Sequence, residues 1–283
     1  MKSRITGLFL TVIFSIALAF NFSVRNSAFG SANTDAKLLG EKGAASRPAV
    51  IVELFTSEGC SSCPPADNVL SWLDDRRPLP GVEIIPLSEH VDYWNHLGWA
   101  DPYSSAAFTE RQREYSQSLR AGVYTPQMVV DGNIQFVGGD REAAIEAITN
   151  ASRMSKATVR IQPIAPANSS ARNRVSFTVE VANIPLNGAK EKGLVFLAVT
   201  ENNLQSNVAG GENSGRNLKH TAVVRQLKMI GKLEARPGAS FLAQPTINIS
   251  KDWKRNDLRA VAFIELQSSR KILGAAESLF PTL

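Results

Sequence analysis

Cysteine is scarce in this 283-residue sequence, which contains only Cys60 and Cys63, so the chain can form no more than one internal disulfide. Long apolar stretches are also absent, because the longest run, residues 5–20, is shorter than the about 20 residues that a membrane-spanning helix needs. No block of lysine and arginine with interleaved aromatic residues occurs, which argues against a nucleic-acid partner. We find no internal repeat and no low-complexity tract. The hydrophobic content of 43% is that of a globular chain, long enough here for two domains.

The N-terminus has the pattern of an export signal. Lys2 and Arg4 form a positive start, the apolar run of residues 5–20 follows, and small residues near Ala32 offer a peptidase cleavage site. Cleavage there would remove three basic residues and no acidic ones, which lowers the formal net charge from +5 to +2. We therefore expect residues 1–32 to direct the protein to the periplasm or out of the cell. The alternative is an uncleaved anchor that holds the protein at the membrane, facing the periplasm, and only then do we expect a membrane contact.

The next two segments predict a leader and an α/β domain. Residues 33–47 contain Gly, Ala, Ser and charged residues without periodicity, which predicts a flexible leader. Residues 48–155 then show β-type and helical patterns in the order β-α-β-α-β-β-α, with a hairpin turn at Asp131 and Gly132. This order, with a C-x-x-C motif after the first strand, predicts a thioredoxin-like domain.

The last segment, residues 156–283, loses helical periodicity and contains seven β-type runs separated by turn-rich stretches. This spacing predicts an all-β antiparallel sandwich of immunoglobulin-like architecture. Because the segment contains no cysteine, such a sandwich would lack an inter-sheet disulfide. The runs are residues 158–164, 174–181, 194–200, 221–230, 240–249, 258–266 and 272–276.

The most informative motif is the pair Cys60 and Cys63, placed where an apolar strand breaks at Gly59 and a helix begins. Sulfurs at this spacing can reach each other, and a helix N-terminus stabilises a thiolate. We predict that Cys60 is the attacking thiolate, with its sulfur toward solvent, and that Cys63 resolves the intermediate. Pro64 and Pro65 fit the first helical turn, where a missing N–H is tolerated. The alternative is a structural disulfide, although a bridge that closes so short a loop adds only about 2 kcal/mol of stability.

Tyr124, Thr125 and Pro126 precede a predicted strand and are our candidates for a substrate groove. In thioredoxin-like folds a proline at this place follows a cis peptide bond and exposes backbone that pairs with a substrate chain. General frequencies favour the trans bond, since only about 5–6% of X–Pro bonds in folded proteins are cis. The C-x-x-C motif upstream leads us to predict the cis form.

Glu58, His90, Trp94 and His96 are auxiliary candidates, because they lie next to the motif or in one aromatic loop. Glu58 could relay protons, but we favour a solvated surface position for it. Two histidines and two thiols could hold copper or zinc. Since the histidine spacing is not that of a helical ligand pair, we favour packing of the loop beside the cysteine turn and predict no metal and no cofactor. His220, in the β-rich half, is expected to be structural.

Six stretches of the sequence share one resemblance: residues 52–67, 90–94, 97–104, 124–132, 211–213 and 218–225. Together they resemble the bacterial secreted thioredoxin-like family known as domain of unknown function 1223. The resemblance covers nearly everything beyond the leader and implies a fold and an exported location, without implying a biochemical role. Compared with thioredoxin itself, the sequence lacks the tryptophan before the first cysteine and the Gly-Pro between the two cysteines.

From these features we expect an exported thiol–disulfide oxidoreductase whose partners are protein thiols or disulfides. Ser61 and Ser62, which lie between the cysteines, indicate neither an oxidising nor a reducing direction. The alternative is a non-enzymatic binding protein for a metal or a protein partner, with the cysteines in a structural disulfide.

Overall fold

The computed structural model describes residues 47–165, 173–185 and 191–281, which belong to one compact unit. The predicted export signal and nearly all of the predicted leader lie outside the described residues. Among the described residues, no helix is both long enough and apolar enough to cross a membrane.

The first half of this unit has the predicted order of elements. Two of its helices are capped by the side chain of the residue before them: Ser105 accepts the Ala107 N–H, and Asp140 accepts the Ala143 N–H. The elements are β1 (Ala49–Thr56), α1 (Pro64–Arg76), β2 (Glu83–His90), a short 3-10 helix (Asn95–Leu97), α2 (Ala106–Leu119), β3 (Gln127–Val130), β4 (Ile134–Val137) and α3 (Arg141–Ser152).

Strand β1 is central in this half. It pairs in parallel with β2 and antiparallel with β3, which in turn pairs with β4. All eight residues of β1 are buried, as expected for a strand covered on both faces. The β3–β4 hairpin turns at the predicted Asp131 and Gly132, whose positive φ angles of 47° and 60° suit the centre of a tight turn closed by the bond from Asn133 N–H to the Val130 carbonyl. A Cβ atom at Gly132 would lie 1.9 Å from the Arg270 carbonyl oxygen, so the turn has no room for a side chain there.

Among its described residues, the second half consists of strands, the connections between them and one short 3-10 turn. Six of the seven predicted β-type runs each coincide with one strand, and the seventh, residues 240–249, divides into β11 and β12. The sequence prediction lacks the short hairpin of β8 and β9. The strands are β5 (Thr158–Ile164), β6 (Arg174–Ala182), β7 (Glu191–Glu201), β8 (Leu204–Asn207), β9 (Asn217–His220), β10 (Val223–Ala235), β11 (Phe241–Ala243), β12 (Thr246–Asn248), β13 (Leu258–Leu266) and β14 (Ile272–Leu279), with a 3-10 turn at Arg255–Asp257.

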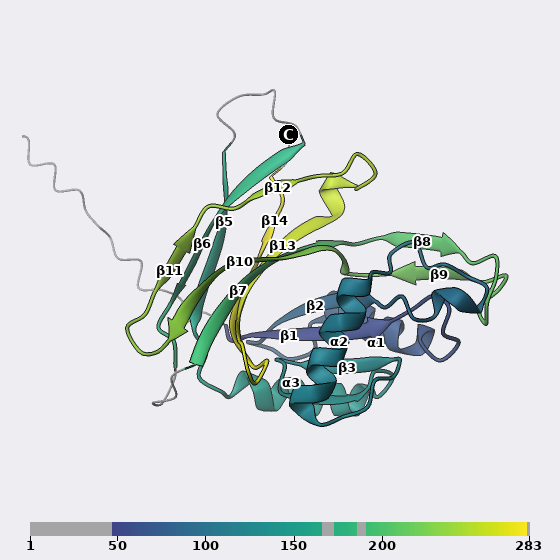
Figure 1. Cartoon of the computed structure of the whole chain (residues 1–283), viewed down its shortest axis with the longest axis horizontal. Coiled ribbons are helices and arrows are strands. Elements are labelled where there is room, and N and C mark those ends of the chain that lie inside the picture. Colours follow the sequence, from purple (N-terminus) through teal and green to yellow (C-terminus); the bar gives the residue numbers. More distant parts are fainter. Residues whose placement is uncertain (1–46, 166–172, 186–190, 282–283) are drawn as a thin grey trace, which may run out of the picture. The chain divides into compact units, whose positions relative to one another are not determined.

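The prediction of a separate thioredoxin-like domain followed by an immunoglobulin-like sandwich is wrong. Strands from both halves form one mixed eight-stranded sheet in the order β14-β13-β7-β10-β2-β1-β3-β4 (Figure 1). The halves join where Val223 of β10 pairs in parallel with Ser88 of β2, whose N–H donates to the Ala222 carbonyl at 2.8 Å. Without β10, strand β2 would leave an unpaired sheet edge, and such edges are normally covered.

A second sheet packs on one face of the shared sheet. In it β6 is flanked by β5 on one side and by β11 and β12 on the other. Its inward side chains, such as Phe177 and Val179, form a core with Leu197 of β7 and Ala262 of β13. The sandwich therefore exists only in part, because one of its two layers continues into the first half of the chain (Figure 1).

The remaining cores tie the helices to the shared sheet. Residues of α1 and α3 pack on one face of β1 and β3. On the opposite face, Ile51 of β1 and Leu87 of β2 share a core with Phe108 of α2, Ala198 of β7 and Phe263 of β13. This core contains residues from both halves of the chain, so neither half encloses it alone.

A buried ion network surrounds Arg111 of α2. Its guanidinium donates from Nε to Glu53 Oε1 at 2.6 Å and from Nη2 to the Tyr115 hydroxyl at 2.9 Å, and Nη2 lies 2.8 Å from Glu265 Oε2. Glu89 of β2 is also fully buried, 3.5 Å from Arg111 Nε, and among the described residues its oxygens have no hydrogen-bond partner. Burial, reinforced by the charge of Glu53, raises the pKa of Glu89 well above its ordinary value. Glu89 therefore binds a proton more readily than an ordinary glutamate.

Candidate functional site

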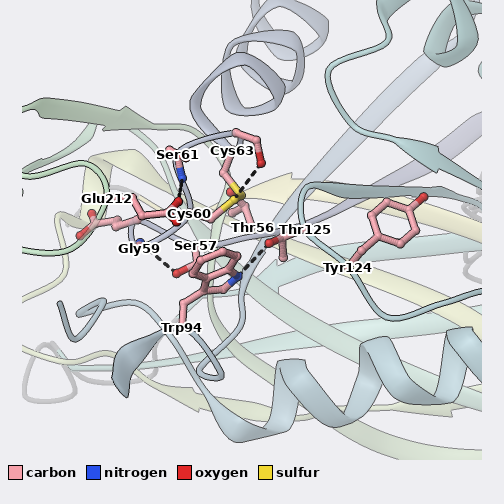
Figure 2. The surroundings of a disulfide bond; sticks show 12 residues. Thr56, Ser57, Gly59, Cys60, Ser61, Cys63, Trp94, Tyr124, Thr125 and Glu212 are labelled. Carbon is pink, nitrogen blue, oxygen red and sulfur yellow. Dashed lines mark hydrogen bonds between the residues drawn. A yellow bond between two sulfur atoms is a disulfide. The ribbon is translucent and has the colours of Figure 1, made fainter. Parts of the chain in front are cut away.

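The cysteine pair lies in the turn between β1 and α1, as predicted, and is bonded in a disulfide with a Cα–Cα distance of 5.4 Å (Figure 2). The turn is closed by backbone bonds from Cys60 N–H to the Ser57 carbonyl and from Cys63 N–H to the Cys60 carbonyl, both at 3.2 Å. Cys63 is the residue before the helix, and Pro64 and Pro65 occupy its first two positions. The disulfide therefore lies at the start of a helix, and its reduction to two thiols would take up two electrons.

Neither cysteine has exposed surface, since both have a relative accessibility of 0%. The prediction that the Cys60 sulfur faces solvent is therefore wrong. Sequence reasoning placed the turn at an open helix end, whereas loops from elsewhere in the chain pack against it. The residues between the cysteines, Ser61 and Ser62, remain exposed, and the Ser62 hydroxyl lies 3.4 Å from Cys60 Sγ.

One of these loops holds the groove candidates. The Thr125–Pro126 peptide bond is cis, as predicted. Pro126 lies beside the first turn of α1, because a Cβ at Gly138 would be 3.5 Å from Pro126 Cβ and 3.0 Å from Ala66 Cβ. Tyr124 points away from the disulfide, and its hydroxyl donates to Gln135 of β4 (Figure 2). The structure thus brings Thr125 and Pro126 to the cysteine turn but not Tyr124.

Trp94 lies against the cysteine turn from the aromatic loop. A Cβ at Gly59 would be 3.1 Å from Trp94 Cβ, so the glycine permits this close approach. The indole Nε1–H donates to the Thr125 hydroxyl at 2.8 Å and links the aromatic loop to the cis-proline loop (Figure 2). Trp94 is therefore part of the disulfide's surroundings, whereas His96 of the same loop is exposed and contributes no hydrogen bond to the site.

Two buried histidine–carboxylate pairs lie behind the turn. Glu58 Oε1 is 2.8 Å from His220 Nε2, and Asp101 Oδ2 is 2.7 Å from His90 Nδ1. The two imidazole rings meet edge to face with centroids 4.9 Å apart. The expectation of a solvated Glu58 is wrong, because its side chain is buried and also accepts the Trp99 indole N–H at 2.8 Å. His220 is buried, as a structural role requires, and its contact with Glu58 places it at the candidate site, where the sequence analysis did not expect it.

The charges of the second pair stabilise each other. Burial alone would lower the pKa of His90, but the charge and hydrogen bond of Asp101 outweigh it and the pKa is raised. Burial pushes the pKa of Asp101 upward, yet His90 and the backbone N–H groups of Glu58 and Tyr103 bring it below its ordinary value. Among the described residues, His90 Nε2 and His220 Nδ1 are buried without a hydrogen-bond partner.

A third loop, between β8 and β9, supplies residues that sequence reasoning did not identify as functional. Asn213 is fully buried, and its Nδ2 donates to the carbonyls of Glu58 and Cys60 at 2.8 and 2.9 Å. Glu212 accepts the Ser61 N–H at 2.9 Å (Figure 2). The stretches 211–213 and 218–225 carried a family resemblance, which was the only signal for this loop and assigned it no role.

The described residues contain no group of three or more His, Cys, Asp or Glu side chains arranged to hold a metal ion. The disulfide and the histidine–carboxylate pairs are groups that can support thiol–disulfide exchange and proton transfer. Three loops and the start of α1 position the groups for it.

A family model described as "Protein of unknown function (DUF1223)" matches residues 51–265. The chain belongs to this family. The match confirms the resemblance to domain of unknown function 1223 seen in the sequence. It includes both cysteines, the cis-proline loop and the β8–β9 hairpin, so the DUF1223 region contains every part of the candidate site.

Two solved structures are similar in fold to this chain over most of its length. The chain is similar to the crystal structure of protein AGR_C_4864 from Agrobacterium tumefaciens, with 25% identity, a TM-score of 0.57, and coverage of 83% of this chain and 95% of that one. It is also similar to HBP35 of Porphyromonas gingivalis, with 16% identity, a TM-score of 0.62, and coverage of 83% and 76%. Both likenesses span the two halves of the described unit. No curated protein matches the chain.

Proposed function

We propose that this DUF1223 protein is an exported thiol–disulfide oxidoreductase that acts on polypeptide thiols or disulfides through Cys60 and Cys63. The observation that carries the proposal is the position of the bonded pair, at the start of α1 and beside the cis Thr125–Pro126 bond. The bacterial, secreted and thioredoxin-like character implied by the sequence supports the same reading. Export rests on residues 1–32 alone.

The exchange proceeds in two steps. In the reducing direction, the Cys60 thiolate attacks one sulfur of a substrate disulfide and displaces the other as a thiolate, which forms a mixed disulfide. Cys63 then loses its proton, attacks the Cys60 sulfur, re-forms the Cys60–Cys63 bond and releases the second substrate sulfur as a thiolate. Two electrons pass to the substrate, whose sulfurs then take up two protons. The oxidising direction is the reverse of these steps.

Access to the sulfurs requires a movement, because neither cysteine is exposed while the disulfide is closed. Among the described residues, the Trp94 indole makes one side-chain hydrogen bond, to Thr125, and the ring packs at the edge of the small core around Phe55. Breaking that bond would free the Thr125 hydroxyl beside the cis-proline loop. We assign Trp94 and Thr125 to the substrate groove for this reason.

The direct test uses a synthetic peptide with one internal disulfide. Reduced Cys63→Ser protein should accumulate a peptide adduct on Cys60, measured by mass spectrometry, because the resolving thiol is missing. Cys60→Ser protein should form none and should lose exchange activity. An active Cys60→Ser variant, or no adduct with Cys63→Ser, would contradict the proposal.

A second candidate function is a non-enzymatic, protein-binding role with a structural disulfide. Complete burial of both cysteines favours it, because structural disulfides are typically inaccessible. The two candidates differ in the reduction potential of the pair, since structural disulfides in exported proteins typically lie below about −300 mV. Equilibration with dithiothreitol and glutathione buffers measures this value, and a potential below that limit would favour the binding role.

A further inference from the structure

The turn between the two cysteines touches a carboxylate from far along the chain. Glu212, in the loop between β8 and β9, accepts the N–H of Ser61, the residue that follows Cys60, at 2.9 Å (Figure 2). This contact lowers the pKa of Glu212 through the hydrogen bonds from Ser61, so the side chain is ionised at neutral pH. The carboxylate of Glu212 therefore places a negative charge beside Ser61, the residue that follows Cys60.

The contact occupies one backbone N–H of the cysteine turn, and the Cys63 N–H is bound to the Cys60 carbonyl. Backbone N–H groups and the positive end of a helix stabilise thiolates at such positions. Here the first two residues of α1 are Pro64 and Pro65, which have no N–H, and the Ser61 N–H is already bound to Glu212. A side-chain donor is present, because the Ser62 hydroxyl lies 3.4 Å from Cys60 Sγ and can donate a hydrogen bond to it.

The histidines near the turn are each paired with a carboxylate, so they bring no net charge that would offset Glu212. Asp67, four residues after Cys63 on the same helix, has a pKa raised by burial, although the charges of His220 and His90 oppose the rise. Glu58 is paired with His220, and the cation of the β8–β9 loop, Arg216, donates to Asn213 Oδ1 at 2.8 Å. Asn213, the residue after Glu212, donates to the carbonyls of Glu58 and Cys60, and these two bonds hold Glu212 beside the cysteine turn.

We propose that Glu212 disfavours the Cys60 thiolate and thereby biases the pair toward the disulfide, so that the protein donates electrons to polypeptide disulfides rather than withdrawing them. The reason is that a pair is a strong oxidant only when its reduced form is stabilised. The electrons pass from the Cys60–Cys63 dithiol to the substrate disulfide, and a dithiol donor reduces the pair again. This inference rests on the proposed exchange at Cys60 and Cys63 and adds its direction.

The test measures two properties of the pair without any protein substrate. Ultraviolet absorbance follows thiolate formation with pH in the reduced protein, and equilibration with glutathione buffers gives the reduction potential. Glu212→Gln keeps an oxygen for the Ser61 N–H but removes the charge, and should favour the reduced form about threefold, which is about 14 mV. Glu212→Lys should shift the equilibrium about tenfold in the same direction, which is about 30 mV.

Glu234→Gln is the matched control, because Glu234 is an exposed glutamate of β10. It should leave both the thiol pKa and the potential at the wild-type values. Unchanged values in both Glu212 variants would overturn the inference, and so would a wild-type potential near the about −120 mV of strongly oxidising pairs. If Glu212 tunes the potential but no peptide adduct forms on Cys63→Ser protein, only the proposed function fails. If the adduct forms but Glu212 has no effect, only this inference fails.

Discussion

Two buried groups of charges lie in this protein, and they are balanced in different ways. Behind the cysteine turn, each carboxylate has its own imidazole: Glu58 with His220, and Asp101 with His90. Around Arg111, three buried glutamates gather at one guanidinium, and Glu89 is left without a hydrogen bond among the described residues. Each carboxylate of the first group has a base beside it, whereas in the second group burial and the charge of Glu53 raise the pKa of Glu89.

The difference matches the position of each group. The paired cluster contacts the turn that carries the cysteines, where the proposed redox chemistry would consume and release protons. The Arg111 network joins α2 to β1, β2 and β13, and thus ties the first half of the chain to the second. We infer that the first group serves the site and that the second holds the shared sheet together.

The largest effect is expected from removing the cation of the second group. Arg111→Met would remove the cation that contacts Glu53, while Glu265 would keep Arg270 Nη1 at 2.9 Å, and breaking a buried pair in this way costs about 3–5 kcal/mol. The urea midpoint of unfolding should fall accordingly. Arg113→Met, two residues away on the same helix, is the control, because Arg113 is exposed and pairs only with exposed Glu110. Equal stability of the two variants would contradict the assigned role.

A smaller effect is expected from breaking the His90–Asp101 pair. In Asp101→Asn, an amide group replaces an oxygen that accepts from Glu58 N–H and contacts His90, which should cost about 2–3 kcal/mol. The raised pKa of His90 stabilises the protein below its unfolded value of 6.5, and this contribution is lost as pH rises through the folded pKa. The lowered pKa of Asp101 stabilises above 3.8, and this contribution is lost as pH falls through the folded pKa.

The pair should therefore contribute most between about pH 3.8 and 6.5. Urea unfolding measured at several pH values should show the largest difference between wild type and Asp101→Asn inside that window and a smaller one at pH 9. Asp252→Asn, at an exposed position, should give a difference near zero throughout. A loss of stability that does not vary with pH would mean that the pair is not ionised in the folded protein.

The smallest effect near pH 5 is expected at Glu89, the buried glutamate of the Arg111 network without a hydrogen-bond partner among the described residues. Because burial raises the pKa of Glu89, the folded state binds a proton that the unfolded state releases above its ordinary value of 4.5. Stability should therefore fall as pH rises from 4.5 toward the folded pKa. Glu89→Gln mimics the protonated acid, so it should be nearly neutral at pH 5 and should stabilise at higher pH, measured by thermal unfolding. A Glu89→Gln curve parallel to the wild-type curve would show that Glu89 is ionised, and Glu110→Gln serves as the exposed control.

Much of the site's local geometry could be predicted from the sequence. The C-x-x-C spacing, the break at Gly59 and the prolines after Cys63 indicated a strand, a turn and a helix, and those elements are present. These elements depend on the intrinsic preferences of a few adjacent residues, which is why short patterns reveal them. The cis bond before Pro126 was predicted differently, from the C-x-x-C motif upstream and against the general frequency of X–Pro bonds.

Short patterns did not predict the hairpin of β8 and β9. Each of its strands has four residues, too few for an alternation to stand out against neighbouring turns. Yet this hairpin carries Glu212, Asn213 and His220 to the cysteine turn. Burial of both sulfurs was missed for the same reason, because loops more than thirty residues from the motif surround them.

The amino-acid order by itself determined the cysteine turn, the alternation of strands and helices in the first half and nearly all of the later strands, since each depends on neighbouring residues. Only the tertiary structure decided that β10 pairs with β2, that one sheet crosses both halves, and that Glu58 faces an imidazole from residue 220. Register between distant strands depends on the joint packing of many side chains, and no short window of residues contains that information.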